Sequence, residues 1–177
     1  AIADSYVKRG MPYTRDNVII TVGGTEALLL SALTLLDPDD EVIISNPYWA
    51  NYAGLVSEMY AKPVLVDVAE KNDFMFDPED LEKAITPKTK AILMNFPSNP
   101  TGALATRENL EGIAKVAVDH DLYVITDEMY HRLLYSDDAF VSLAEMPGMK
   151  DRAIIVDGFS KTYAMTGWRI GYAVGNK

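Results

Sequence analysis

Short apolar runs alternate with longer segments of helical spacing along most of this chain. Runs rich in Val and Ile predict β-strands at Val18–Val22, Glu41–Ser45, Pro63–Val68, Ala91–Phe96, Leu122–Asp127, Ala153–Phe159 and Ile170–Val174. Apolar residues three and four positions apart predict helices at Thr25–Leu36, Trp49–Tyr60, Pro78–Ile85 and Arg107–Asp119. Because parallel strands need a crossover connection, this alternation predicts an α/β fold with a mainly parallel sheet.

Two segments stand outside the alternation. Residues Ile2–Gly10 have the pattern of the end of a helix that stops at a glycine. Residues Ser136–Arg152 show no clear period, so we expect a surface excursion that contains one short helix. Neither segment changes the predicted fold class.

The composition is that of a globular protein with one domain. The chain has 177 residues, of which 49% are hydrophobic and 24% are charged, enough for a substantial core. It has no cysteine and only two histidines, which argues against disulfides, thiolate chemistry and a metal centre. The longest apolar stretch, Ala27–Leu36, is too short to span a bilayer, and no signal segment opens the chain. We therefore expect a cytoplasmic protein with no membrane partner.

The net charge restricts the kind of partner further. A formal charge of −10 at pH 7 argues against binding to nucleic acid or acidic membranes, because such surfaces need clustered lysine and arginine. Any phosphate group must therefore be bound by a local site. Most arginines lie in stretches that predict surface helices or loops, namely Arg9, Arg15, Arg107, Arg132 and Arg152.

Candidate ligand-binding residues follow several of the predicted strands, where open parallel sheets bind their ligands. Gly23, Gly24 and Thr25 open a helix, where backbone N–H groups and the helix dipole can bind an anion, although a simple glycine turn is the alternative. Trp49 could stack on a flat ring or anchor a helix in the core. Asn99 could donate its amide to a ligand, or only form an Asn-Pro turn.

Three charged residues complete the predicted site. Asp127 ends a buried strand, so its carboxylate needs a partner, either a helix N-terminus or a protonated pyridine nitrogen. Lys161 follows a neighbouring strand, and we expect it to be held inside the protein, where desolvation favours the neutral amine that forms Schiff bases. Arg169 could bind a phosphate through two hydrogen bonds. The alternative is that Lys161 and Arg169 are ordinary surface cations.

Four motifs together resemble the large domain of class I aminotransferases, the aspartate aminotransferase family of fold-type I pyridoxal-phosphate enzymes. They are Gly24-Thr25-Glu26-Ala27-Leu28, Asn99-Pro100-Thr101-Gly102, Asp127-Glu128-Met129-Tyr130, and the stretch from Ser160-Lys161 through Gly167-Trp168-Arg169-Ile170-Gly171-Tyr172. The resemblance implies a three-layer fold, with a mainly parallel seven-stranded sheet, its last strand antiparallel, and helices on both faces. It also implies that residues 1–17 are the remnant of an N-terminal helix and linker, and that residues 18–177 are the cofactor-binding large domain without its small domain.

The resemblance assigns a role to each candidate residue. Lys161 corresponds to the Schiff-base lysine, which also moves the proton at the substrate's α-carbon. Asp127 corresponds to the acid that keeps the pyridine nitrogen of pyridoxal 5'-phosphate protonated, so that the ring acts as an electron sink. Tyr130 and Asn99 correspond to the pair that hydrogen-bonds the phenolic oxygen, and Trp49 to the aromatic residue stacked on the ring. The phosphate cup corresponds to Gly24, Thr25, Ser160 and Arg169.

The chain departs from the family's pattern at a few places. Gly158 stands where many members have a serine whose hydroxyl binds the phosphate. The family's arginine that clamps the substrate carboxylate and the tyrosine from a neighbouring subunit both fall outside residues 1–177. The resemblance also implies cis prolyl bonds at Asn46-Pro47 and Asn99-Pro100.

The function implied is pyridoxal-phosphate-dependent transfer of an amino group between an amino acid and a 2-oxo acid, by a homodimer in the full-length protein. A carbon–sulfur lyase or a decarboxylase would use the same lysine, aspartate and phosphate cup. An aminotransferase-like ligand sensor fused to a DNA-binding module is another interpretation, but no helix-turn-helix is visible and the charge is strongly negative. These residues do not determine which amino acid is the substrate.

Overall fold

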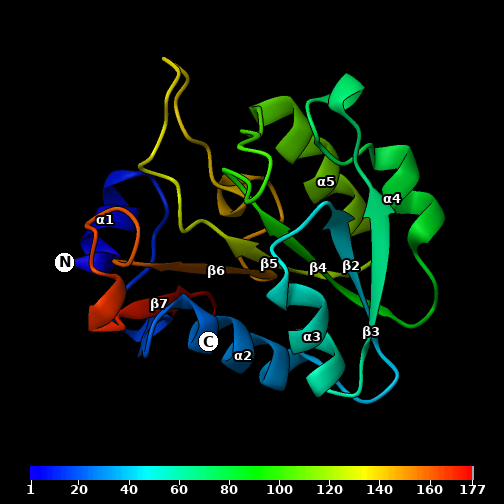
Figure 1. The fold of residues 1–177 in the computed structure, drawn as a ribbon, viewed down its shortest axis with the longest axis horizontal. Helices are drawn as coiled ribbons and strands as arrows, with labels where there is room; N and C mark the ends of the chain where they lie inside the picture. Colours follow the sequence, from blue (N-terminus) through cyan, green and yellow to red (C-terminus); the bar gives the residue numbers. More distant parts are fainter. Residues whose placement is uncertain (177) are drawn as a thin grey trace.

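The computed structural model describes residues 1–176 and contains one seven-stranded sheet with helices on both faces (Figure 1). The strand order is β1-β7-β6-β5-β4-β2-β3, and all neighbours are parallel except β7, which runs antiparallel to β1 and β6. The strands are β1 (Val18–Thr21), β2 (Glu41–Asn46), β3 (Lys62–Asp67), β4 (Thr89–Asn95), β5 (Tyr123–Asp127), β6 (Ala153–Gly158) and β7 (Gly171–Val174). The predicted fold class and the antiparallel last strand are confirmed.

Helices from two sets cover the two faces of this sheet. The α-helices within residues 1–176 are α1 (Ile2–Lys8), α2 (Gly24–Leu35), α3 (Asn51–Glu58), α4 (Pro78–Ala84) and α5 (Arg107–Asp119). Tyr6 of α1, Leu81 of α4 and Leu110 of α5 pack into one apolar core. Leu28 of α2 and Tyr52 of α3 pack into the other. The sheet therefore separates two cores, as a three-layer fold requires.

The continuous apolar runs are explained by this double coverage. Successive side chains of a strand point to opposite faces, so a central parallel strand must be apolar at every position. Ile43 and Ile92 belong to the core beneath α4 and α5, whereas Ile44 and Leu93 belong to the core beneath α2 and α3. All four side chains are at most 1% exposed.

Two predicted segments differ from expectation. Residues 136–152 do contain one short helix, the 3-10 turn Leu143–Glu145, but the segment is not a surface excursion throughout. Leu143, Met146 and Met149 are at most 2% exposed, because their three-residue spacing turns them together onto the α5 side of the sheet. The segment before β1 is also packed, since Tyr6 and Tyr13 are buried in the same core. The division at residue 18 stays a prediction, and its second part ends at Lys177, outside the described residues.

Backbone details agree with the sequence in part. Cis prolyl bonds occur at Asn46-Pro47 and Asn99-Pro100, as predicted, and also at Phe96-Pro97, which was not predicted. The second predicted helix begins at Asn51 rather than Trp49, because the chain turns through Pro47 before the helix starts. Within residues 1–176, no helix is long and apolar enough to cross a membrane.

The start of β7 crosses the start of α2 at very short range. A Cβ atom placed on Gly171 would lie 2.3 Å from the carbonyl carbon of Gly23 and 2.4 Å from the nitrogen of Gly24. Both of these are backbone atoms, which cannot move aside as a flexible side chain can. Glycine at position 171 is therefore required for β7 to reach the loop that precedes α2.

Replacing Gly171 by alanine should destabilise the protein, whereas the same replacement at Gly54 should not. We expect Gly171→Ala to lower the free energy of unfolding by about 1–3 kcal/mol, the usual cost of an overpacked site. Gly54 lies in α3, and a Cβ atom placed on it would have no neighbouring atom within 4 Å, so Gly54→Ala should raise that free energy by about 0.5–1 kcal/mol through helix propensity. Urea unfolding measures both values, and equal stability of Gly171→Ala and wild type would contradict the close approach.

Candidate functional site

A pocket of about 260 Å³ opens at the carboxyl ends of the parallel strands. All nine residues to which the resemblance assigns a role line it, which are Gly24, Thr25, Trp49, Asn99, Asp127, Tyr130, Ser160, Lys161 and Arg169. The pocket also has lining residues that the sequence did not single out, namely Leu28, Tyr52, Asn95, Met129 and Thr166. The structure thus brings the predicted residues to one place, while their individual roles stay predictions.

One end of the pocket is formed by the start of α2. Gly23 has a φ of 79° and places the first turn of α2 with no side-chain cap on its N–H groups. The Arg169 guanidinium lies against this backbone, since a Cβ on Gly23 would be 2.3 Å from Arg169 Nη2. Arg169 Nη1 donates a hydrogen bond to the carbonyl oxygen of Thr166 at 3.0 Å. Uncapped N–H groups beside an arginine make this end suited to a dianion such as a phosphate.

Gly158, where the family often has serine, is crowded in this chain. A Cβ at this position would lie 3.0 Å from the carbonyl oxygen of Ile170 and 3.1 Å from Met129 Cε. Met129 Cε also fills the space beside Gly24, at 2.5 Å from a Cβ placed there. The methionine side chain therefore occupies the space that larger residues at 24 or 158 would need.

Asp127 lies at the floor of the pocket and is 7% exposed. The Tyr52 hydroxyl donates to its Oδ2 at 2.8 Å, and the Met129 N–H donates to its Oδ1 at 3.0 Å. Burial raises the pKa of Asp127 to about 6, even though these two hydrogen bonds stabilise the carboxylate and lower that pKa. The charged form of Asp127 is thus only partly compensated by the protein itself, and a cationic N–H group in the pocket would complete the compensation.

Asn95, the last residue of β4, fixes the positions of its neighbours. Its side-chain amide donates to the Asp127 carbonyl oxygen at 2.8 Å, and its side-chain oxygen accepts from the Asn99 N–H at 2.7 Å. The Asn99 amide in turn reaches the Tyr130 hydroxyl at 3.5 Å, and burial raises the pKa of that hydroxyl. Asn95 and Tyr52 were missed because a polar residue ending a strand, or a tyrosine in a helix, has many ordinary explanations.

Trp49 packs against the core, as one of its two predicted roles requires, and its stacking on a ligand ring stays a prediction. It is half-buried and lines the pocket, and it also packs edge-to-face on Tyr52 with ring centroids 5.3 Å apart. Because Tyr52 hydrogen-bonds Asp127, one aromatic pair holds both a pocket wall and the buried carboxylate. The signal that could have revealed Tyr52 is its position three residues after Trp49.

The expected burial of Lys161 is wrong. Lys161 and Arg169 are both exposed, although both line the pocket. The reason is local: after β6 the chain leaves the sheet in a series of turns and a 3-10 turn at Thr166–Trp168, and this segment lies at the molecular surface. The amine therefore reaches the pocket from its open side.

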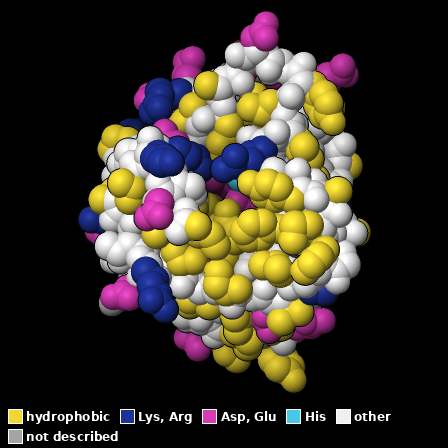
Figure 2. Space-filling model, turned by 90° about the vertical axis from the view of Figure 1, so that its left-hand side faces the viewer, with side chains coloured by type: hydrophobic (Ala, Val, Ile, Leu, Met, Phe, Trp, Pro, Cys, Tyr) yellow, Lys and Arg dark blue, Asp and Glu magenta, His cyan; other side chains and the backbone are white. Residues whose placement is uncertain are grey.

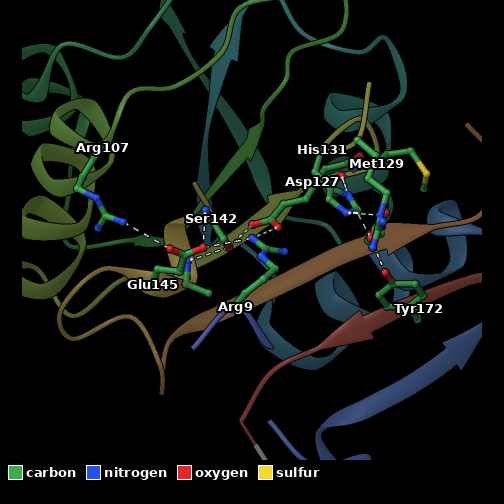
Figure 3. A network of polar contacts seen from close by, with 12 residues as sticks. Arg9, Arg107, Asp127, Met129, His131, Ser142, Glu145 and Tyr172 are labelled. Atoms are coloured by element: carbon green, nitrogen blue, oxygen red, sulfur yellow. Dashed lines mark hydrogen bonds and ion pairs between the residues drawn. The ribbon is translucent and has the colours of Figure 1, made fainter. Parts of the chain in front are cut away.

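The sequence predicted Arg9 in a surface stretch, but Arg9 belongs to a polar network on the face of the sheet that α5 covers (Figure 3). Its guanidinium is 5.5 Å from the Tyr6 ring and 5.2 Å from the Phe140 ring, and its Nη2 lies 3.9 Å from Glu128 Oε2. Glu128 is 1% exposed and accepts a hydrogen bond from Ser142. Burial raises the pKa of Glu128 to about 8. Local pattern could not show this, because the partners of Arg9 come from distant segments.

A second buried acid lies beside the network. Asp157 accepts hydrogen bonds from the Tyr172 hydroxyl and the Gly158 N–H, and its Oδ2 is 3.4 Å from His131 Nδ1. Burial raises the pKa of Asp157 to about 6 and lowers the pKa of His131 to about 4. Within residues 1–176, no three His, Asp or Glu side chains form a group that could hold a metal ion.

Comparison with known proteins places this geometry among aminotransferases. The family model described as aminotransferase class I and II matches residues 1–177. The chain is 41% identical to the aspartate aminotransferase of Bacillus subtilis (strain 168), over 100% of the chain and 46% of that protein. It is 44% identical to the aspartate aminotransferase of Geobacillus stearothermophilus, over 96% of the chain and 43% of that protein.

Solved structures give the same result. The aspartate aminotransferase from Thermus thermophilus with maleate superposes with a TM-score of 0.93 at 42% identity, covering 98% of this chain and 45% of that one. The aromatic aminotransferase from Pyrococcus horikoshii OT3 has a TM-score of 0.96 at 39% identity, covering 99% of this chain and 48% of that one. The chain thus spans about half the length of the relatives that it matches.

Replacing Asp127 by asparagine should stabilise the ligand-free protein at pH 8 but not at pH 4. The folded-state pKa of about 6 is above the usual 3.8, so the folded state binds the proton more tightly and wild-type stability falls as the pH rises from about 4 to 6. A shift of this size corresponds to at most about 3 kcal/mol. Urea unfolding at pH 4, 6 and 8 measures the difference, with the exposed-site variant Asp137→Asn as control. A gain that is the same at every pH would contradict the buried charge.

Proposed function

The chain belongs to the class I and II aminotransferase family, and on that premise we propose that the protein transfers an amino group between an amino acid and a 2-oxo acid, using pyridoxal 5'-phosphate. One observation supports this proposal most strongly. A single pocket brings together an amine, a buried carboxylate and an arginine at an uncapped helix start, from Lys161, Asp127 and Arg169. These are the groups that a phosphorylated pyridine aldehyde needs.

The residues present fit that cofactor. The uncapped N–H groups of α2 and the Arg169 guanidinium suit a phosphate, and the close approach at Gly23 leaves no room for a side chain there. We assign the phosphate to Gly24, Thr25, Ser160 and Arg169. We assign the face of the ring to Trp49, and the phenolic oxygen to Tyr130 and Asn99, whose polar groups already lie 3.5 Å apart. When bound, the cofactor supplies an electron sink for a carbanion at the substrate's α-carbon.

Asp127 is assigned to the ring nitrogen. A buried carboxylate whose pKa is raised to about 6 is stabilised in its charged form by a cationic N–H partner. Tyr52 and the Met129 N–H fix both carboxylate oxygens, so the free acceptor capacity of Asp127 has a defined direction. The role of Asp127 is therefore to hold a proton on the ring nitrogen.

Lys161 is assigned to the reactive amine. Among the described residues it is the only lysine that lines the pocket. It follows β6, the parallel neighbour of β5, so the two strands bring Lys161 and Asp127 to the same edge of the sheet. In this position its amine can move a proton to and from the substrate's α-carbon.

The relatives favour amino transfer over the other reactions of this fold. Those described above are named aminotransferases, which argues for transamination rather than a carbon–sulfur lyase, a decarboxylase or a ligand sensor. Their names also suggest which donors to test first, aspartate and then an aromatic amino acid.

We further infer that the protein acts as a cytoplasmic homodimer. Figure 2 shows apolar side chains gathered over one side of the molecule. Large apolar side chains that are more than half exposed include Ile19, Ile20, Val22, Leu33 and Trp168. Apolar surface of this kind is usually covered in an assembly, and a second copy is the partner that the family implies.

Labelling tests the assignment of Lys161. Incubation with pyridoxal 5'-phosphate followed by borohydride reduction should attach the cofactor to the peptide that contains Lys161, as read by mass spectrometry. The Lys161→Ala variant should lose this label, whereas Lys83→Ala, which removes an exposed lysine of α4, should keep it. Equal labelling of several lysines would remove the basis for the assignment.

Turnover tests the function itself. The complete protein, mixed with pyridoxal 5'-phosphate, aspartate and 2-oxoglutarate, should form glutamate, and Asp127→Asn should reduce the rate by at least about a hundredfold because an unprotonated ring is a poor electron sink. Tyrosine in place of aspartate tests the aromatic alternative. Release of ammonia or carbon dioxide without glutamate formation would indicate a lyase or a decarboxylase instead.

A further inference from the structure

A second cavity lies on the α5 side of the sheet, away from the pocket described above. Its volume is about 340 Å³, and it lies between the segment before β1, the start of α5 and the segment around the 3-10 turn Leu143–Glu145. Its polar lining consists of Arg9, Tyr13, Arg107, Glu145 and Lys150. Among the described residues, none lines both this cavity and the first pocket.

Positive charge exceeds negative charge in this lining. The lining contains three cations and a single carboxylate, Glu145. Arg9 Nη2 lies 3.3 Å from Glu145 Oε1, and Arg107 Nη2 lies 3.5 Å from Glu145 Oε2 (Figure 3). Each arginine uses one terminal nitrogen in these contacts, and a guanidinium has five N–H donors. Lys150 forms no ion pair within the part of the chain that the structure describes. In a chain with a net charge of −10, this local excess is unusual.

The second carboxyl group near Arg9 does not remove the excess at neutral pH. Glu128 lies 3.9 Å from Arg9 but is not among the described residues that line the cavity, and burial raises its pKa to about 8, which favours its neutral form. Aromatic rings of Tyr6 and Phe140 hold the Arg9 guanidinium in place. Arg9 is therefore a fixed cation with donors left over.

The cavity lining also contains a buried tyrosine. Tyr13 lines the cavity and is 3% exposed, yet its hydroxyl has no hydrogen-bond partner among the described residues. Because the hydroxyl itself is buried, it does not face the open space of the cavity. Burial also raises the pKa of Tyr13, so this residue adds no negative charge to the lining.

We propose that this cavity is a binding site for a small oxyanion, held by Arg9, Arg107 and Lys150. Planar guanidinium groups match the oxygens of phosphates and carboxylates, and the lysine adds a mobile charge at the rim. A volume of about 340 Å³ accommodates a phosphate or carboxylate group together with bridging water. The site is separate from the phosphate-binding end of the first pocket and does not depend on the reaction proposed there.

Calorimetric titration of the complete protein with inorganic phosphate tests this proposal. The titration is made in an Arg169→Ala background, which disables the phosphate-binding end of the first pocket, and at constant ionic strength set with chloride. We expect saturable binding at one site. Lys150→Ala should raise the phosphate Kd about tenfold or more, the usual effect of losing one charged donor.

The controls separate a site from general electrostatics. Lys62→Ala removes the same charge from an exposed lysine on the edge strand β3 and should leave the phosphate Kd unchanged. Acetate in place of phosphate shows which class of oxyanion the cavity prefers. Circular dichroism confirms that each variant is folded. Absence of saturable binding, or the same Kd in Lys150→Ala as in Lys62→Ala, would mean that Arg9, Glu145 and Arg107 form a structural network only and would overturn the proposal.

Discussion

The site depends on a carboxylate held almost out of water at the end of β5. Desolvation penalises the charge of Asp127, and the protein compensates it only in part, through the Tyr52 hydroxyl and the Met129 N–H. These two hydrogen bonds also fix the orientation of the carboxylate, and with it the direction of the lone pairs that can accept a further hydrogen bond. A position that costs stability in the ligand-free protein is thereby prepared for a cationic partner, which is a common arrangement at functional sites.

Asp127 and Glu128, at the end of β5 and directly after it, face opposite sides of the sheet. Side chains alternate across a sheet, so Asp127 faces the pocket while Glu128 faces the opposite core. There Glu128 meets Ser142 and Arg9, which links the N-terminal segment and the segment before β6 to the same strand. The placement of Asp127 is thus held from both sides of the sheet, by hydrogen bonds in the pocket and by a buried polar network behind it.

The end of the pocket to which we assign a phosphate depends instead on the absence of side chains. Gly171 lies against Gly23 and Gly24, and Met129 fills the space beside Gly24 and Gly158. This close packing brings the last two strands up to the start of α2, so that Arg169 reaches the uncapped helix end. Backbone N–H groups can then contribute to anion binding where a serine hydroxyl at position 158 is missing.

The sequence by itself determined the layered fold, the order of its elements and the residues that follow each strand, because periodicity and turn residues act over short distances. It also placed Asp127 and Lys161 at one edge, since consecutive parallel strands end on the same side. Tertiary structure alone decided burial and pairing. Lys161 is exposed, Arg9 is enclosed by aromatic rings and acids, and Tyr52 is the partner of Asp127. Each outcome depends on which distant segments meet, and a local pattern of residues does not determine those contacts.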